Sequence, residues 1–114
     1  MNGNKLRRSV GLSVCFALLL TGGCSRGPAK PVHRVHTVEI KQMQFQPAQL
    51  TVQKEDTVVF INRDIVTHTA TEEGSKAWSS PALASGNSWR LVARQNADYY
   101  CTFHPVMKGK LLVR

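Results

Sequence analysis

Short runs of apolar and β-branched residues, separated by polar residues, recur along the chain from about Val35 onward. Val38 and Ile40 alternate with polar neighbours, whereas residues 58–61 are apolar without interruption. A period of two is typical of a strand with one buried face, and a continuous apolar run is typical of a strand buried on both faces. The pattern predicts seven strands, at residues 36–42, 49–53, 57–62, 69–72, 88–93, 98–101 and 110–113.

The fold class follows from the absence of a helical period. No segment repeats apolar residues every three or four positions over the length of a helix. Short strands must pair in sheets and share a buried face, so the pattern predicts an all-β sandwich over residues 35–114. Polar breaks at 54–56 and 94–96 separate neighbouring strands, although neither break contains a glycine.

The first 34 residues follow a different pattern. Three cations between residues 5 and 8 precede an apolar run at 10–20, which is shorter than the roughly 20 residues that span a bilayer. This order of features, with small residues before Cys24, is typical of a secretory signal, so we predict a signal peptide over residues 1–23. Residues 24–34 contain glycine, prolines and cations without an apolar period, which predicts a flexible tether.

Cys24 stands where a bacterial lipobox places the cysteine that becomes a lipidated N-terminus. The segment L-T-G-G-C resembles a lipobox, although its leucine lies one position further from the cysteine than usual. An ordinary signal peptidase could instead cut after the small residues and release a soluble product. Both routes predict export to the periplasm, and we expect lipidation of Cys24 and attachment to the membrane.

The net charge of the chain without residues 1–23 indicates little about its binding partners. The chain has a net charge of +8, and removal of the predicted signal peptide takes away three cations and lowers the charge to +5. The remaining cations are spread along the chain, with no arginine-rich stretch and no alternation of basic and aromatic residues. We therefore expect one small monomeric domain with no nucleic-acid partner.

Cys101 is the one thiol left inside the predicted domain. It has no disulfide partner, because Cys15 lies in the signal peptide and Cys24 at the mature N-terminus. Cys101, His104 and Met107 combine a thiol, an imidazole and a thioether at spacings of three. Thiolate and imidazole bind soft or borderline metals, and a thioether favours copper. Burial of the thiol as a small apolar side chain is the competing interpretation.

A trigonal copper site needs a second nitrogen ligand, from another loop. His68 follows the most apolar strand, where the chain has to turn toward the second sheet, so we expect it to complete the site. The remaining histidines, His33 and His36, lie in the tether and in the first strand. We expect solvated or structural roles for them, with an accessory metal site as the alternative.

These segments resemble the cupredoxins, the type 1 blue copper proteins. The resemblance rests on C-T-F-H-P-V-M with its continuation K-G-K-L-L-V, on D-T-V-V-F-I-N-R-D-x-x-x-H, on F-x-P-A-x-L-x-V and on W-S-S-P-A-L-A-S-G-N-S-W. It covers residues 35–114 and is strongest to the amicyanin-like members of the plastocyanin-like group. It implies an eight-stranded Greek-key sandwich that binds one copper ion through His68, Cys101, His104 and, weakly, Met107.

Several positions depart from the family pattern. Thr69 stands where an asparagine usually ties the two ligand loops together, and Glu55 stands where a turn glycine is common. Phe103 replaces a proline common in the ligand loop, and we expect its added N–H to turn toward the sulfur of Cys101. Filling the apolar rim around His104 is the alternative role of Phe103.

The resemblance implies an electron carrier of the periplasm rather than an enzyme. A rigid Cys-His-His set with a long axial methionine suits both copper oxidation states, and nothing in the sequence predicts substrate chemistry. We expect electrons to enter through His104, with Met43 either in the apolar rim around it or in the core. The expected partners are a c-type cytochrome or a periplasmic dehydrogenase.

Three other classes of protein could use the same residues. A copper carrier or buffer would exchange metal rather than electrons. A hydrolase based on Cys101 and His104 would need an exposed thiol, an orienting group and an oxyanion hole. A structural zinc site would usually need two or more thiolates.

Overall fold

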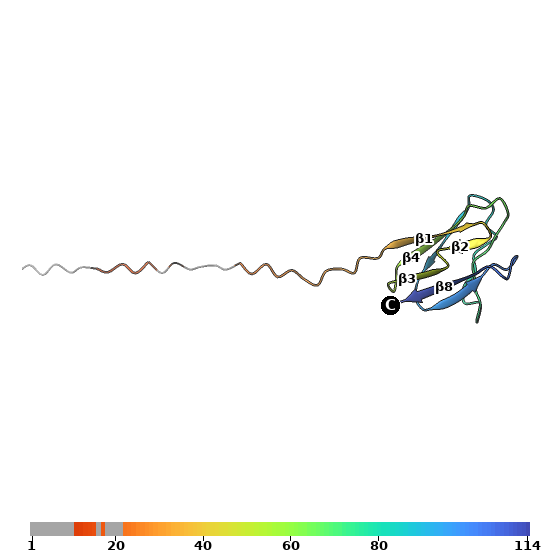
Figure 1. The fold of residues 1–114 in the computed structure, drawn as a ribbon. Helices are drawn as coiled ribbons and strands as arrows, with labels where there is room; N and C mark the ends of the chain where they lie inside the picture. Colours follow the sequence, from red (N-terminus) through yellow and green to blue (C-terminus); the bar gives the residue numbers. More distant parts are fainter. Residues whose placement is uncertain (1–10, 16, 18–21) are drawn as a thin grey trace, which may run out of the picture. The chain divides into compact units, whose positions relative to one another are not determined.

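The computed structural model describes residues 11–15, 17 and 22–114 of the chain. Much of the predicted signal peptide, namely residues 1–10, 16 and 18–21, lies outside the described residues. The described residues up to Lys30 contain no helix or strand, and the unit Pro31–Arg114 contains all eight strands (Figure 1). Among the described residues, no helix has the length and apolar character needed to cross a membrane.

Eight strands form two four-stranded sheets. The strand order is β2-β1-β4-β6 in the first sheet and β3-β8-β7-β5 in the second. The pairs β1–β4 and β3–β8 are parallel and the others antiparallel, which confirms the expected all-β Greek-key sandwich. The strands are β1 Val35–Lys41, β2 Gln44–Gln46, β3 Gln49–Val52, β4 Thr57–Asn62, β5 Thr71–Glu72, β6 Ser88–Val92, β7 Ala97–Tyr100 and β8 Lys108–Val113.

Alternation along the strands sets the buried face of the first sheet. Val38 and Ile40 in β1 are fully buried, whereas Thr37 and Lys41 are exposed. Strand β4, the apolar run of the sequence, lies between β1 and β6, as its composition predicts. Side chains of β4 are alternately buried and half-buried, so neither face of this strand is fully exposed to solvent. Apolar residues are therefore tolerated at every position from 58 to 61.

An aromatic cluster fills the space between the sheets. The ring of Tyr99 packs edge-on against Phe45 and Phe60, with centroid distances of 4.8 and 5.3 Å. Tyr99 also pairs with Gly109 on the neighbouring strand, where a Cβ atom would lie 2.2 Å from Cζ of the tyrosine ring. Gly109 is therefore the residue that leaves room for the tyrosine ring.

The loops gather at two opposite ends of the sandwich. The end that we call the terminal pole contains the entry to β1, the turn at 53–56 and the C-terminus, where the N–H of Lys54 donates to the carbonyl of Arg114. The other end, the loop pole, contains the turn at 42–43 and the loops 63–70 and 101–107. Because β1 and β4 are parallel, both begin at the terminal pole and end at the loop pole (Figure 1).

A buried carboxylate organises the terminal pole. Asp56 accepts the N–H of Arg34 at 2.8 Å and that of Gln53 at 3.0 Å, and its Oδ2 lies 2.8 Å from Nε2 of His36. The Arg34 N–H, followed by the His36 ring, lowers the pKa of Asp56 to about 2. His36 thus has a structural role. The neighbouring Glu55 has a φ of 71°, the left-handed conformation in which a glycine is common.

Candidate metal centre

Three donor atoms from two loops converge at the loop pole. The Sγ atom of Cys101 lies 3.7 Å from Nδ1 of His68 and 3.8 Å from Nδ1 of His104. All three atoms lie within 4.8 Å of one another, and within the described part of the chain no other histidine, cysteine and carboxylate side chains form such a group. Metal bonds of roughly 2.0–2.3 Å at trigonal angles require donor separations of about this size. The structure therefore brings together the two histidines and the cysteine that the sequence singled out.

The loop from Cys101 to Met107 is closed by its own backbone. The N–H of His104 donates to the carbonyl of Cys101 at 3.2 Å, and the N–H of Met107 donates to the carbonyl of His104 at 2.9 Å. A third bond, from the N–H of Cys101 to the carbonyl of Met107 at 3.1 Å, brings the two ends together. The buried Met107 therefore lies beside the donor group, while His104 is half-buried.

His68 is fully buried and is fixed at its second ring nitrogen. Its Nε2 lies 2.8 Å from Oδ2 of Asp64, which also accepts the N–H of Met43; Oδ1 accepts the N–H of Gln42. A carboxylate at one ring nitrogen fixes the tautomer and leaves Nδ1 free to face a metal ion. Partial burial by itself raises the pKa of Asp64. The hydrogen bonds from the N–H of Met43, the His68 ring and the N–H of Gln42 have the opposite and larger effect, so the pKa of Asp64 is lowered.

Asp64 is the aspartate of the D-x-x-x-H segment in the sequence, but no role was predicted for it. Its own backbone N–H donates to Oδ1 of the buried Asn62 at 2.9 Å, and the Asn62 amide donates to the carbonyls of Val66 and Leu83 at 2.7 and 2.8 Å. These bonds fold the loop between Asn62 and His68 so that a carboxylate four residues earlier meets the imidazole. A carboxylate at that spacing before a candidate ligand histidine is the signal that could have identified Asp64.

Thr69 ties the two loops together. Its Oγ1 accepts the N–H of Thr102 at 2.9 Å and lies 2.9 Å from the Thr102 hydroxyl, and its own N–H donates to Sγ of Cys101 at 3.4 Å. The Thr69 hydroxyl thus joins the loop that contains His68 to the loop that contains Cys101. Among the described residues, no hydrogen bond joins the expected donor, the N–H of Phe103, to Sγ; the backbone N–H that donates to Sγ is that of Thr69. Phe103 is 55% exposed, as a residue in the outer part of a turn should be.

Five exposed apolar side chains, which we call the apolar rim, lie on the turn and the two loops of the loop pole, which also contains the half-buried His104. The most exposed are Ile65 and Val106, at 94% and 90%. Met43 is 41% exposed and so belongs to this surface and not to the core. The rim consists of Met43, Ile65, Val66, Phe103 and Val106.

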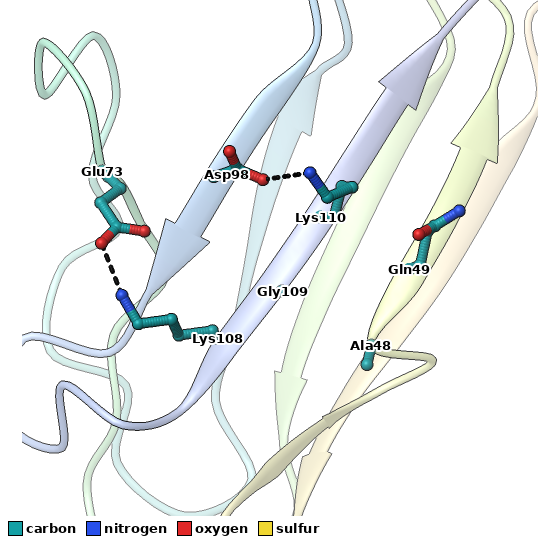
Figure 2. A pocket seen from close by; sticks show the side chains of 7 residues that line it. All are labelled: Ala48, Gln49, Glu73, Asp98, Lys108, Gly109 and Lys110. Carbon is teal, nitrogen blue, oxygen red and sulfur yellow. Dashed lines mark hydrogen bonds and ion pairs between the residues drawn. The ribbon is translucent and has the colours of Figure 1, made fainter.

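A separate hollow on the second sheet contains no candidate chemistry. The ion pairs Glu73–Lys108 and Asp98–Lys110, at 2.5 and 2.8 Å, border it (Figure 2). Each lysine already has a carboxylate partner, so neither of them offers an uncompensated charge to a ligand. The side chains that line this hollow include no histidine or cysteine.

Comparison with known proteins identifies the family. A family model described as copper-binding proteins of the plastocyanin/azurin family matches residues 32–114. The chain belongs to this family. It is 33% identical over 82 residues to amicyanin of Paracoccus denitrificans, a match that covers 67% of this chain and 63% of that protein. It is 22% identical over 130 residues to amicyanin of Paracoccus versutus, with 99% and 98% covered.

Solved structures of two amicyanin variants and of a copper-containing nitrite reductase share the fold. A methionine-to-alanine variant of amicyanin with Cu(I) has a TM-score of 0.66 and 28% identity, over 70% of this chain and 82% of that one. A reduced proline-to-phenylalanine variant of amicyanin has a TM-score of 0.64 and 30% identity over the same shares. A copper-containing nitrite reductase of Thermus scotoductus matches 75% of this chain but only 23% of its own length, with a TM-score of 0.64 and 26% identity.

The donor set fits one type 1 copper ion, the cofactor that the cupredoxin resemblance implies. Type 1 sites take two imidazoles and a thiolate in a trigonal arrangement, with a weak axial thioether. The His68, Cys101 and His104 group, with Met107 beside it, has this composition. A structural zinc ion would usually take two or more thiolates, and Cys101 is the one thiol near the group.

Thr69→Val tests the tie in this cupredoxin. The substitution keeps the size of the side chain but removes the hydroxyl that bonds to Thr102, so we expect a loss of about 1 kcal/mol in stability and a shifted reduction potential. Thermal unfolding and voltammetry of the copper-loaded protein measure the two effects. Thr69→Ser keeps the hydroxyl and should resemble the wild type; equal shifts in both variants would show that the hydroxyl does not matter.

Proposed function

We propose that this protein is a periplasmic electron carrier in which His68, Cys101, His104 and Met107 bind one type 1 copper ion. The observation that carries the proposal is the convergence of two Nδ1 atoms on the buried Sγ of Cys101, in a chain of the plastocyanin/azurin family. When bound, copper supplies a one-electron couple between Cu(II) and Cu(I). Similarity to the amicyanins supports this proposal.

The protein holds the donors in place through bonds that do not involve the metal. Asp64 fixes the His68 ring, Thr69 donates to the Cys101 sulfur, and the loop backbone positions Met107. Donors that are already positioned for both oxidation states move little when an electron is transferred, which favours fast transfer. Met107 would hold copper as a fourth ligand and would leave no open coordination position for a substrate, so we propose a carrier and not an enzyme.

His104 is the proposed port for electrons. It is half-buried, whereas His68 is fully buried behind it. The apolar rim around His104 suits a brief docking encounter, because it excludes water without requiring a large interface. We propose redox proteins as partners, namely a c-type cytochrome or a periplasmic dehydrogenase.

Added imidazole can replace a missing histidine side chain, and its effect should differ between His104 and His68. His104→Gly should leave a copper site that added imidazole enters from solvent, with recovery of the original spectrum. His68→Gly should recover little, because that side chain is fully buried and held by Asp64. Titration of each copper-loaded variant with imidazole, followed by visible absorption, measures the difference. Equal recovery in both variants would argue against His104 as the port.

Addition of Cu(II) to the purified domain tests the proposed function. We expect an intense blue charge-transfer band, a narrow copper hyperfine splitting and a reversible one-electron wave in voltammetry. A colourless protein would overturn the electron-carrier proposal. A colourless complex that exchanges copper rapidly with a chelator would support the second candidate, a copper carrier or buffer.

We propose further that residues 1–23 are removed and that Cys24 is lipidated, which would attach the domain to the membrane through residues 24–34. The basic start, the apolar run and the L-T-G-G-C segment support this processing. The expected result is an acylated mature protein in the membrane fraction, and Cys24→Ser should lose the acyl mass. An intact mass that corresponds to an unmodified chain would contradict lipidation.

A further inference from the structure

Two thioethers border one cavity at the loop pole. The cavity has a volume of about 390 Å³, and its lining includes Met43, Phe45, Ala48, Val106 and Met107. Met43 is 41% exposed and Met107 is 4% exposed. One cavity is therefore lined both by a half-exposed methionine and by the buried methionine of the loop that holds Cys101 and His104. Apart from Met1, these are the only methionines of the chain.

The turn itself does not explain why residue 43 is a methionine. Gln42 and Met43 form the two-residue turn between β1 and β2, with φ values of 53° and 57°. Asparagine and glycine adopt this conformation at lower cost than other residues. Asp64 offsets part of the cost by accepting both N–H groups, at 2.7 and 3.0 Å. The same carboxylate fixes His68, so the position of Met43 is tied to that of a proposed ligand.

The lining of the cavity suits a soft cation. Thioethers bind Cu(I) and discriminate against harder ions, and they carry no proton that would have to leave first. The rest of the lining is mixed, with the apolar Phe45, Ala48 and Val106 beside the uncharged polar side chain of Gln44. The charged side chain at the cavity, Lys108, is paired with Glu73, so its charge is compensated.

We propose that Met43 and Met107 form an entry route through which the protein takes up Cu(I). Met43 captures the ion at the mouth of the cavity, and Met107 receives it beside the donor group. Cys101 then forms its bond to the metal and releases the thiol proton to water, so that copper stays Cu(I) and no electron is exchanged. The inference rests on the proposed copper centre, but it concerns the uptake of metal and not the transfer of electrons.

Metal-free protein mixed with Cu(I) bicinchoninate tests this route. The loss of the chelate colour reports the rate of uptake, and Met43→Leu should slow it about tenfold. The rate at which the blue band develops with Cu(II), and the reduction potential, should stay within experimental error, because neither depends on the Met43 sulfur. Gln44→Leu, which changes another lining side chain without removing a sulfur atom, is the control and should take up Cu(I) at the wild-type rate.

Each other outcome contradicts the route. Equal rates for wild type and Met43→Leu would show that the exposed thioether has no role. Equal slowing by Gln44→Leu, or of Cu(II) uptake, would show that cavity shape and not sulfur controls access. Absence of the blue band from the wild type would overturn the copper centre and the route together, whereas equal Cu(I) rates with an intact blue band overturn the route alone.

Discussion

Cys101→Ser is expected to abolish the intense blue absorption of the copper-loaded protein. The thiolate is the proposed source of the charge-transfer band and the strongest ligand, and a serine oxygen replaces neither property. The variant should also lose the stabilisation that copper gives to the folded state, which is about 2.7 kcal/mol when free metal is a hundredfold above its dissociation constant. Visible spectra and thermal unfolding with and without Cu(II) measure both losses.

The metal-free proteins provide the control for Cys101→Ser. Cysteine and serine have similar sizes, and the serine hydroxyl can still accept the N–H of Thr69, so the metal-free variant should unfold within about 2 kcal/mol of the wild type. Cys24→Ser is the matched variant, since Cys24 is exposed and far along the chain from the metal centre. It should keep the full blue band. A blue band retained in Cys101→Ser would exclude Cys101 as the ligand.

Gly109→Ala is expected to destabilise the fold strongly. The new Cβ would lie 2.2–2.4 Å from three atoms of the Tyr99 side chain, which is buried and packs against Phe45 and Phe60. Overpacking of a core costs about 1–3 kcal/mol, and contacts this short place the variant at the upper end. The melting temperature of the metal-free domain should fall by more than about 10 °C.

Gly86→Ala separates the effect of packing from that of backbone conformation. Gly86 has a φ of 83°, and a Cβ there would meet no atom within 4 Å. Its substitution should cost about 1–2 kcal/mol through backbone strain alone. If Gly109→Ala were no more destabilising than Gly86→Ala, the tyrosine would have room to shift, and the close packing of the aromatic cluster would not be essential.

The sequence was sufficient for most of the fold because the strand periodicity is strong. The alternation around Val38 and Ile40 and the apolar run of β4 are the clearest examples, and the seven predicted ranges agree with β1 and β3–β8 within two residues at each end. Strand β2 was missed because its single buried side chain, Phe45, lies between two glutamines directly after the turn at 42–43, so no alternation of apolar residues marks it. It forms because the tight turn at 42–43 brings it beside β1.

The donor residues were predictable, but their supporting contacts were not. Cys101, His104 and Met107 lie close together in the sequence, so their spacing alone indicates a metal site. The roles of Asp64 and Thr69 depend on loop conformation, which brings together residues 22 and 33 positions apart along the chain. The expected N–H from Phe103 to sulfur failed for the same reason, since donor direction depends on the turn and not on residue order.

The parallel pairing of β1 and β4 places the proposed membrane attachment and the proposed docking surface at opposite ends of the sandwich. The chain enters the sandwich at the terminal pole, and β1, with seven residues, extends about 23 Å toward the loop pole. A membrane-tethered form would therefore keep His104 accessible while its N-terminus is held, and residues 24–34 would allow an excursion of up to about 36 Å. The length of the tether can thus set how often the domain meets a membrane-bound or a soluble partner, independently of the reduction potential. Evolution could lengthen or shorten residues 24–34 to change partners without altering any residue that contacts copper.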